Sequence, residues 1–341
     1  MRRLLNTIYI TNENIYLSLD GENLVCQLNG KTALRVPFDN IENIVCFNYL
    51  GCSPVLMGKC VEKQIPINFL SPQGRFLAKV YGGIKGNVFL RVAQLEKFKK
   101  KGLELAQNTI AAKISNTCKL IKRSQHDNPA LRTDEKVNCV LERLQQGIET
   151  VFNSDGIDNV IGVEGNCASE YFSVFGKLLK HHKNSGISFN GRSKHPPLDP
   201  VNAALSFVYT LETNDYAAAL ETVGIDSYIG FCHALRSGRP SLACDMVEEA
   251  RCIVERFVIT LFNLQILREN DFEKQISGAV WLNEEGRKKL ITQWQEKKRT
   301  DIEHPYLHQR IPLGLLPYVQ SNLLAKYLRE EIPEYQCFLL K

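Results

Sequence analysis

The apolar pattern of this chain changes once, at the glycine-rich residues 82–86. Before this point, short and partly alternating apolar runs are separated by turn residues, as at 12–14 and 29–31, which is typical of β-strands. From Val88 onward apolar residues recur at helical spacing. The change predicts an α+β fold, in which a small N-terminal β-domain (1–86) precedes a larger all-α catalytic domain (87–341).

The same patterns place the individual elements. Strands are expected at 7–10, 15–19, 24–27, 33–36, 41–47, 65–70 and 76–81, with one short helix at 54–63. Helices are expected at 88–105, 110–123, 135–152, 203–211, 215–223, 241–269 and 286–298. Two glycines and three prolines make 183–200 a loop, and Asp199-Pro200 is a typical helix start. The part from His304 is expected to mix helix and loop.

Composition narrows the class of protein. A hydrophobic fraction of 44%, a charged fraction of 23% and a net charge of +5 are those of an ordinary soluble protein. This charge permits nucleic-acid binding without requiring it. The apolar start of the chain is interrupted at Asn6, and the longest apolar run, 257–267, is too short to span a membrane. Eleven scattered cysteines without a C-x-x-C pair indicate free thiols and no zinc site. A cytoplasmic protein without membrane contact is therefore expected.

The segment 230–251 carries the residues best suited to chemistry. His233 precedes a turn rich in Gly, Pro and Arg, and Asp245 is expected to open the helix that follows. Glu248 lies three residues later, so both carboxylates project from one helix face. An imidazole and two carboxylates suit a Mg²⁺ or Mn²⁺ site that handles phosphate. The alternative is structural, with a core histidine and two acids that interact with the helix dipole.

Glu164 is a further candidate, at an expected junction of loop and helix over 161–172. It lies between Gly162 and Gly165 in an apolar or small context, where an unpaired acid is costly to bury. The glycines allow the backbone to approach a ligand closely. A carboxylate that caps its own helix is the alternative.

Together these residues resemble the CRISPR-associated integrase, the catalytic subunit of spacer acquisition. The resemblance covers nearly the whole chain. It rests on 41–44, 65–76, 87–94, 162–165, 171–172, 189–202, 224–233 and 239–251. The segments 304–308 and 311–317 are similar to the type I-C lineage.

This resemblance implies that Glu164, His233 and Glu248 hold a divalent metal ion, Mg²⁺ or Mn²⁺. Asp245 is expected close by, as a ligand or as a second acid behind the ligands. Many relatives have Asp at the position of Glu248, which leaves the ligand geometry open. The four residues are the expected catalytic set.

The implied reaction is a transesterification that joins the 3′-hydroxyl of a prespacer DNA to the CRISPR repeat. The resemblance also implies a homodimer formed through the β-domains, and a heterohexamer with a small ferredoxin-fold CRISPR-associated partner. Arg192, Lys194, Arg236 and Arg239 are candidates for holding DNA phosphates, with solvated loop charges as the alternative. A general metal-dependent nuclease and a non-catalytic DNA-binding scaffold are the competing hypotheses.

Overall fold

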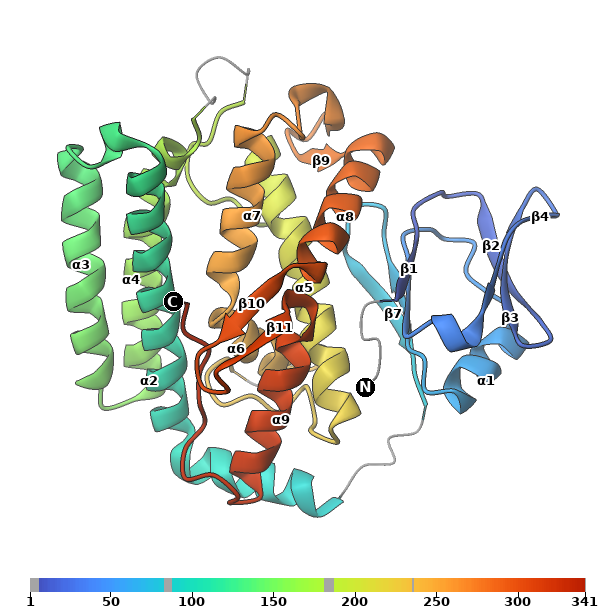
Figure 1. Ribbon diagram of the computed structural model, residues 1–341, viewed down its shortest axis with the longest axis horizontal. Helices are drawn as coiled ribbons and strands as arrows, with labels where there is room; N and C mark the ends of the chain where they lie inside the picture. Colours follow the sequence, from blue (N-terminus) through green and yellow to red (C-terminus); the bar gives the residue numbers. More distant parts are fainter. Residues whose placement is uncertain (1–5, 83–87, 181–186, 235, 341) are drawn as a thin grey trace.

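A computed structural model describes residues 6–82, 88–180, 187–234 and 236–340 of the chain. In Figure 1 the N-terminal strands, in blue, form a small lobe beside a larger lobe of helices. The expected α+β fold class is therefore confirmed. The expected domain boundary between 86 and 87 falls in a stretch outside the described residues, so it stays a prediction.

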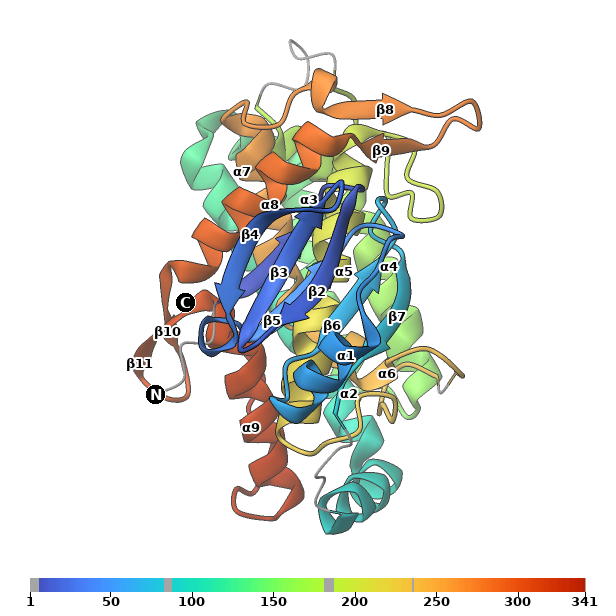
Figure 2. The same ribbon diagram turned by 90° about the vertical axis from the view of Figure 1, so that its right-hand side faces the viewer.

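The described part of the N-terminal lobe, called the β-lobe below, contains two small sheets and one α-helix, and Figure 2 views it face on. Its elements are β1 Thr7–Ile10, β2 Ile15–Asp20, β3 Asn23–Leu28, β4 Lys31–Pro37, β5 Asn43–Cys46, α1 Pro54–Glu62, β6 Ile67–Leu70 and β7 Phe76–Val80. The strand order of the first sheet is β1-β5-β6-β7, in which only β7 is antiparallel to its neighbour. The antiparallel strands β2, β3 and β4 form the second sheet. Every strand expected before residue 82 is present.

The helical lobe contains the remaining elements. Its helices are α2 Val88–Asp127, α3 Glu135–Phe152, α4 Ile157–Phe175, α5 Pro200–Thr222, α6 Ser241–Glu248, α7 Arg251–Asn263, α8 Glu284–Arg299 and α9 Leu316–Leu328. Two hairpins join them, β8 Phe272–Lys274 with β9 Val280–Leu282, and β10 Asp301–His304 with β11 Gln309–Pro312. The lobe is therefore not purely helical, and His304 ends a strand where helix or loop was expected.

Helix boundaries differ from the expected ones in three places. The expected helices 88–105 and 110–123 are one helix, α2, and 203–211 and 215–223 are one helix, α5. No proline interrupts either helix. Polar side chains in the expected gap do not end α2, because they form hydrogen bonds with neighbouring segments; Gln107, for example, donates to the Ser154 carbonyl at 2.9 Å. Conversely, 241–269 divides into α6 and α7. The backbone turns there because the Ala250 N–H donates to Val247, three residues back.

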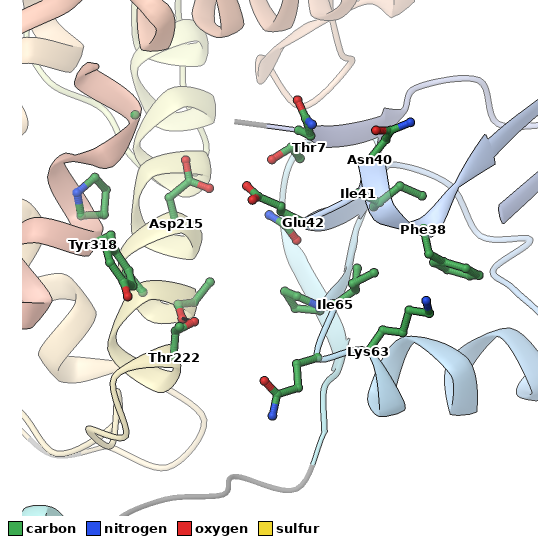
Figure 3. Close-up of a pocket in the computed structure, with 18 of the residues that line it drawn as sticks. Thr7, Phe38, Asn40, Ile41, Glu42, Lys63, Ile65, Asp215, Thr222 and Tyr318 are labelled. Atoms are coloured by element: carbon green, nitrogen blue, oxygen red, sulfur yellow. Dashed lines mark hydrogen bonds between the residues drawn. The ribbon is translucent and has the colours of Figure 1, made fainter. Parts of the chain in front are cut away.

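Several contacts fix the β-lobe to the helical lobe. Lys79 Nζ lies 2.5 Å from the Glu221 carboxylate, in a pair that is nearly buried. The rings of Phe47 and Phe207 stack with centroids 5.3 Å apart, and Gln295 donates to the Tyr9 hydroxyl at 2.8 Å. A cavity of about 550 Å³ remains between the lobes. Figure 3 shows the residues that line it, among them Glu42 of the β-lobe and Asp215 of the helical lobe. None of the residues described around this cavity belongs to the predicted catalytic set.

Two expectations from composition can be checked in the structure. All eleven cysteines are free, and most of them are buried, as expected for unpaired core thiols. Among the helices that the structure describes, none combines the length and apolar character that crossing a membrane requires.

Glu212, a buried carboxyl of α5, gives a prediction about pH. Burial and the nearby Asp215 raise the pKa of Glu212 from 4.5 to about 8, although Lys298 opposes the rise. A carboxyl with a raised folded pKa stabilises the fold at low pH, and this contribution is lost as pH rises through the folded pKa. Between pH 5 and pH 9 the free energy of unfolding should therefore fall more in wild type than in Glu212→Gln. Urea denaturation across this pH range measures the free energy of unfolding of both proteins. Parallel dependence on pH in the two would contradict a raised pKa of Glu212.

Candidate active site

The predicted acids come from two helices of the helical lobe. Glu164 lies on α4, and Asp245 and Glu248 lie on α6. His233 lies in the loop that precedes α6. The residue that connects the two helices is Lys113 on α2, which the sequence analysis did not single out.

Lys113 lies between two carboxylates. Its Nζ pairs with Glu164 Oε1 and lies 2.6 Å from Glu248 Oε2, and its side chain is only 13% exposed. Burial alone lowers the pKa of a lysine, but the charges of Glu248 and Glu164 outweigh burial and raise the pKa of Lys113 above its usual value. A cation thus balances two acids taken from different helices.

Glu248 is the most deeply buried of the charged groups that contact Lys113. Its Oε1 forms an ion pair with Arg251 Nη2 at 2.8 Å, and His233 Nε2 lies 3.8 Å from the same oxygen. Burial acts to raise the pKa of this carboxyl, but the charges of Arg251 and Lys113 hold the pKa of Glu248 at about 2. Glu248 is therefore an ionised group at neutral pH.

Asp245 holds the imidazole and its loop in place. Asp245 is fully buried, and His233 Nδ1 lies 2.6 Å from its Oδ1. The backbone N–H groups of Phe231, Cys232 and His233 also donate to this carboxylate, at 2.7, 3.0 and 2.8 Å. With Nδ1–H bonded to Asp245, the neutral imidazole keeps its lone pair on Nε2, on the side of Glu248.

Two further residues position this loop. A Cβ on Gly230 would lie 2.5 Å from Asp245 Oδ2, so only glycine allows the loop to pass this close to the acid. Gln94 of α2 is buried and donates to the carbonyls of Asp226 and Ile229 at 2.9 and 2.8 Å. Gly230 and Gln94 thus fix the position of the loop that carries His233.

Two local predictions about these acids were wrong. Glu164 lies in the interior of α4 and not at a junction of loop and helix. Gly162 and Gly165 are helical, and a Cβ on either would meet nothing within 4 Å, so their role is not to admit a backbone. Asp245 does not open its helix, because α6 begins at Ser241. The packing of α4 against α2 and α3 overrides the low helix propensity of glycine.

The four predicted phosphate contacts divide into two pairs. Arg192 and Lys194 line the same small pocket as Glu164 and Lys113. Arg192 is half-buried, and its guanidinium donates to Asn202 Oδ1 at 2.8 Å and to Ser206 Oγ at 3.1 Å. Arg236 and Arg239 belong to the loop after His233 and are absent from the described lining of this pocket. Arg236 is exposed, as a solvated loop charge would be.

Residues whose partners are distant in sequence were not predicted as part of the site. Lys113 sits among Ala111, Ala112 and Ile114, and a lysine within a buried helix face was the available signal. Arg251 ends the segment 230–251 that carries the predicted acids, but its pairing with Glu248 was not predicted. Glu255, also buried, accepts from the Tyr209 hydroxyl at 2.7 Å and lines the pocket.

The donor types fit a hard divalent metal ion, although the cluster is closed around an ammonium. Among the described residues, no group of three or more His, Cys, Asp or Glu side chains is arranged to hold a metal ion. However, Glu248 Oε2 is buried without an aligned hydrogen-bond donor, although Lys113 Nζ lies 2.6 Å away. Two carboxylates and one imidazole nitrogen suit Mg²⁺ or Mn²⁺. A metal ion fits these residues if the Lys113 ammonium moves aside.

The fold and this cluster define an α+β protein with a centre of acids, imidazole and cations in its helical lobe. A family model described as CRISPR associated protein Cas1 matches residues 8–296. The CRISPR-associated endonuclease Cas1 2 of Rhodospirillum rubrum is 41% identical over 341 residues, which cover 98% of each chain. The chain therefore belongs to the Cas1 family of CRISPR-associated endonucleases.

Solved structures share the fold at lower identity. A casposase bound to integration product superposes with a TM-score of 0.84 at 19% identity, over 97% of this chain and 92% of that one. A chain of a Cas6-RT-Cas1–Cas2 complex gives a TM-score of 0.81 at 20% identity, over 97% of this chain and 36% of that one. The β-lobe and the helical lobe thus occur together in other proteins.

Proposed function

We propose that this chain is the metal-dependent integrase and endonuclease of CRISPR adaptation. It would join the 3′-hydroxyl ends of a prespacer DNA to the CRISPR repeat by transesterification. The observation that carries the proposal is the position of Lys113 Nζ between Glu164 and Glu248, with His233 beside them. A site that accommodates one cation between two acids is suited to exchange that cation for Mg²⁺ or Mn²⁺. Membership of the Cas1 family supports the same reaction class.

Each residue of the cluster has a role in this proposal. Glu164, Glu248 and His233 Nε2 would hold the metal ion, which would supply positive charge to stabilise the attacking 3′-oxygen and the reacting phosphate. Asp245 fixes the tautomer and direction of His233 through the bond to Nδ1. Because Asp245 also accepts from backbone N–H groups, we assign it to positioning rather than to direct ligation. Lys113, once displaced, remains a cation close to the reacting phosphate.

In this proposal the DNA backbone reaches this centre past four basic residues, Arg192, Lys194, Arg236 and Arg239. Arg192 and Lys194 line the pocket with Glu164, so their charges lie where a phosphate next to the reacting bond would pass. Arg236 and Arg239 extend the charge along the loop after His233. Phosphate contacts of this kind position a DNA strand without reading its sequence.

The wider assembly is also part of the proposal. The chain would form a homodimer through its β-lobe and a heterohexamer with a small ferredoxin-fold CRISPR-associated partner, in the cytoplasm. One solved neighbour is a Cas6-RT-Cas1–Cas2 complex, and the Cas2 of that complex supports a partner of this kind. The segments at 304–308 and 311–317 support a place in the type I-C lineage.

A strand-joining assay tests the reaction. Purified protein and partner receive Mn²⁺, a target that contains the repeat, and a prespacer with either free or blocked 3′ ends. We expect joined products from the free 3′-hydroxyl alone. Cleavage that ignores the state of the ends would indicate a general nuclease, and the absence of both products a DNA-binding scaffold.

The proposed phosphate contact of Lys194 gives a prediction about the salt dependence of DNA binding. Lys194→Ala should weaken DNA binding, and the slope of log K against log salt should fall by about one, because one phosphate contact is lost. Lys101→Ala is the matched control, since its ammonium pairs with Glu104 at 2.7 Å on the exposed surface of α2. Fluorescence anisotropy at several salt concentrations measures both slopes. Equal slopes for the two variants would remove Lys194 from the DNA path.

A further inference from the structure

Glu249, the residue after Glu248, is fully buried and bonds to a segment far along the chain. Its Oε1 accepts from Gln320 Nε2 and from the Tyr335 hydroxyl, both at 2.8 Å. Its Oε2 accepts from the backbone N–H of Phe338 at 2.8 Å. A buried carboxylate is thus satisfied by one helix, α9, and by the segment 335–340, called the strap below.

Asn116 of α2 ties the strap to the same place. Asn116 is fully buried, and its Nδ2 donates to the carbonyls of Glu249 and Phe338 at 2.8 and 2.9 Å. Its Oδ1 accepts from the backbone N–H of Leu340 at 2.8 Å. Figure 1 shows the strap, in dark red, running up beside α2 to the end of the chain. Strap, α2 and the junction of α6 with α7 are therefore held together by side chains at one point.

This point lies directly behind the acid cluster. Asn116 is one helical turn after Lys113 on α2, and Glu249 follows Glu248 at the end of α6. The bond between Asn116 and the Glu249 carbonyl therefore sets the separation of α2 from α6 beside the pair of Lys113 with Glu248. A change of that separation moves the Glu248 carboxylate relative to Glu164.

We propose that the strap is a positioning element of the site: through Glu249 and Asn116 it holds Glu248 where it can ligate a divalent metal ion. The inference rests on the proposed function, since it assumes that Glu248 is a metal ligand. Residues that orient metal ligands affect metal affinity even though they do not touch the metal. A strap that only covers the apolar core would affect stability and leave metal affinity unchanged.

Two substitutions loosen the strap without removing a metal ligand. Tyr335→Phe deletes one donor to Glu249 and keeps the ring. Glu249→Gln places an amide N–H against either the Phe338 N–H or the Gln320 Nε2 donor, depending on how the amide is turned. The binding of Mn²⁺ alone is measured on folded protein by isothermal titration calorimetry. We expect Mn²⁺ to bind about tenfold more weakly to Glu249→Gln, with a smaller loss for Tyr335→Phe. In strand joining, the Mn²⁺ concentration for half-maximal rate should rise while the rate at saturating Mn²⁺ stays near that of wild type.

Leu290→Ala is the control, because Leu290 is fully buried on α8 and lies outside the strap and the acid cluster. It should lower the melting temperature and leave Mn²⁺ affinity unchanged. Wild-type affinity in both strap variants would overturn the inference, and Tyr335→Phe decides alone if Glu249→Gln does not fold. A wild-type protein that binds no Mn²⁺ and joins no DNA would instead overturn the proposed function.

Discussion

Glu164→Gln is expected to lower the rate of DNA joining by about 10²- to 10³-fold, because one of the two carboxylates proposed to hold a metal ion is lost. The fold should persist, since the Glu164 side chain is 24% exposed and Glu248 remains to balance Lys113. His233→Ala should reduce joining similarly. Glu248→Ala should abolish joining and also destabilise the protein, because it leaves Lys113 and Arg251 facing each other in a buried site. Joining in Mn²⁺ and the far-ultraviolet circular dichroism spectrum are measured for each variant.

The matched control for Glu164 lies on the same helix. Glu170 of α4 pairs with Arg143 at 2.5 Å on the surface, so Glu170→Gln removes the same charge away from the cluster. Joining by this variant should equal that of wild type. Full activity of the Glu164, His233 and Glu248 variants alike would place the chemistry elsewhere in the protein.

The second large effect concerns Lys113, the cation at the centre of the cluster. In metal-free buffer Lys113→Met should lose about 3–5 kcal/mol of stability, because Glu164 and Glu248 are left without the ammonium between them. Added Mn²⁺ should restore much of this stability, since an ion that binds the folded state alone stabilises it by mass action. Melting temperatures in chelator and in Mn²⁺ should therefore differ more for this variant than for wild type.

Lys298 offers a control with the same chemistry in another place. Its buried ammonium lies 2.9 Å from the Asp215 carboxylate, at the contact with the β-lobe. Lys298→Met should lose comparable stability, but Mn²⁺ should not restore it. If Mn²⁺ raised the two melting temperatures equally, the special role of Lys113 as the stand-in for a metal ion would be refuted.

Local signals were sufficient for most of the fold. Turn residues separate the strands of the β-lobe, and the Asp199 cap at the start of α5 was correctly predicted, with its carboxylate accepting from Asn202 N–H at 2.8 Å. Helix ends were harder to predict because distant contacts decide them. The break between α6 and α7 is stabilised by Asn116, whose bond to the Glu249 carbonyl spans more than a hundred residues of sequence.

The site was predictable in its acids and not in its cations. His233, Asp245 and Glu248 stand close together in the sequence, so their spacing alone suggested a cluster. Glu164 was found from its unusual neighbours, although the glycines suggested a loop where α4 is continuous. Lys113 carries no motif, and its partners are known only once α2, α4 and α6 are packed. The separate roles of Asp245 and Glu248 likewise depend on which atoms face them.

The two adjacent glutamates at the end of α6 restrict how this segment can vary in length. Glu248 pairs with cations of the acid cluster, and Glu249 accepts hydrogen bonds from the strap. Successive residues of a helix point about 100° apart. Inserting one residue between Ser241 and Glu248 would rotate Glu248 into the surroundings of Glu249, and deleting one would rotate Glu249 into those of Glu248. Substitutions on the outer side of α6 can be compensated locally, but a change in its length cannot. We therefore expect libraries of single-residue insertions and deletions to tolerate none in this helix while accepting them in the turn between β8 and β9.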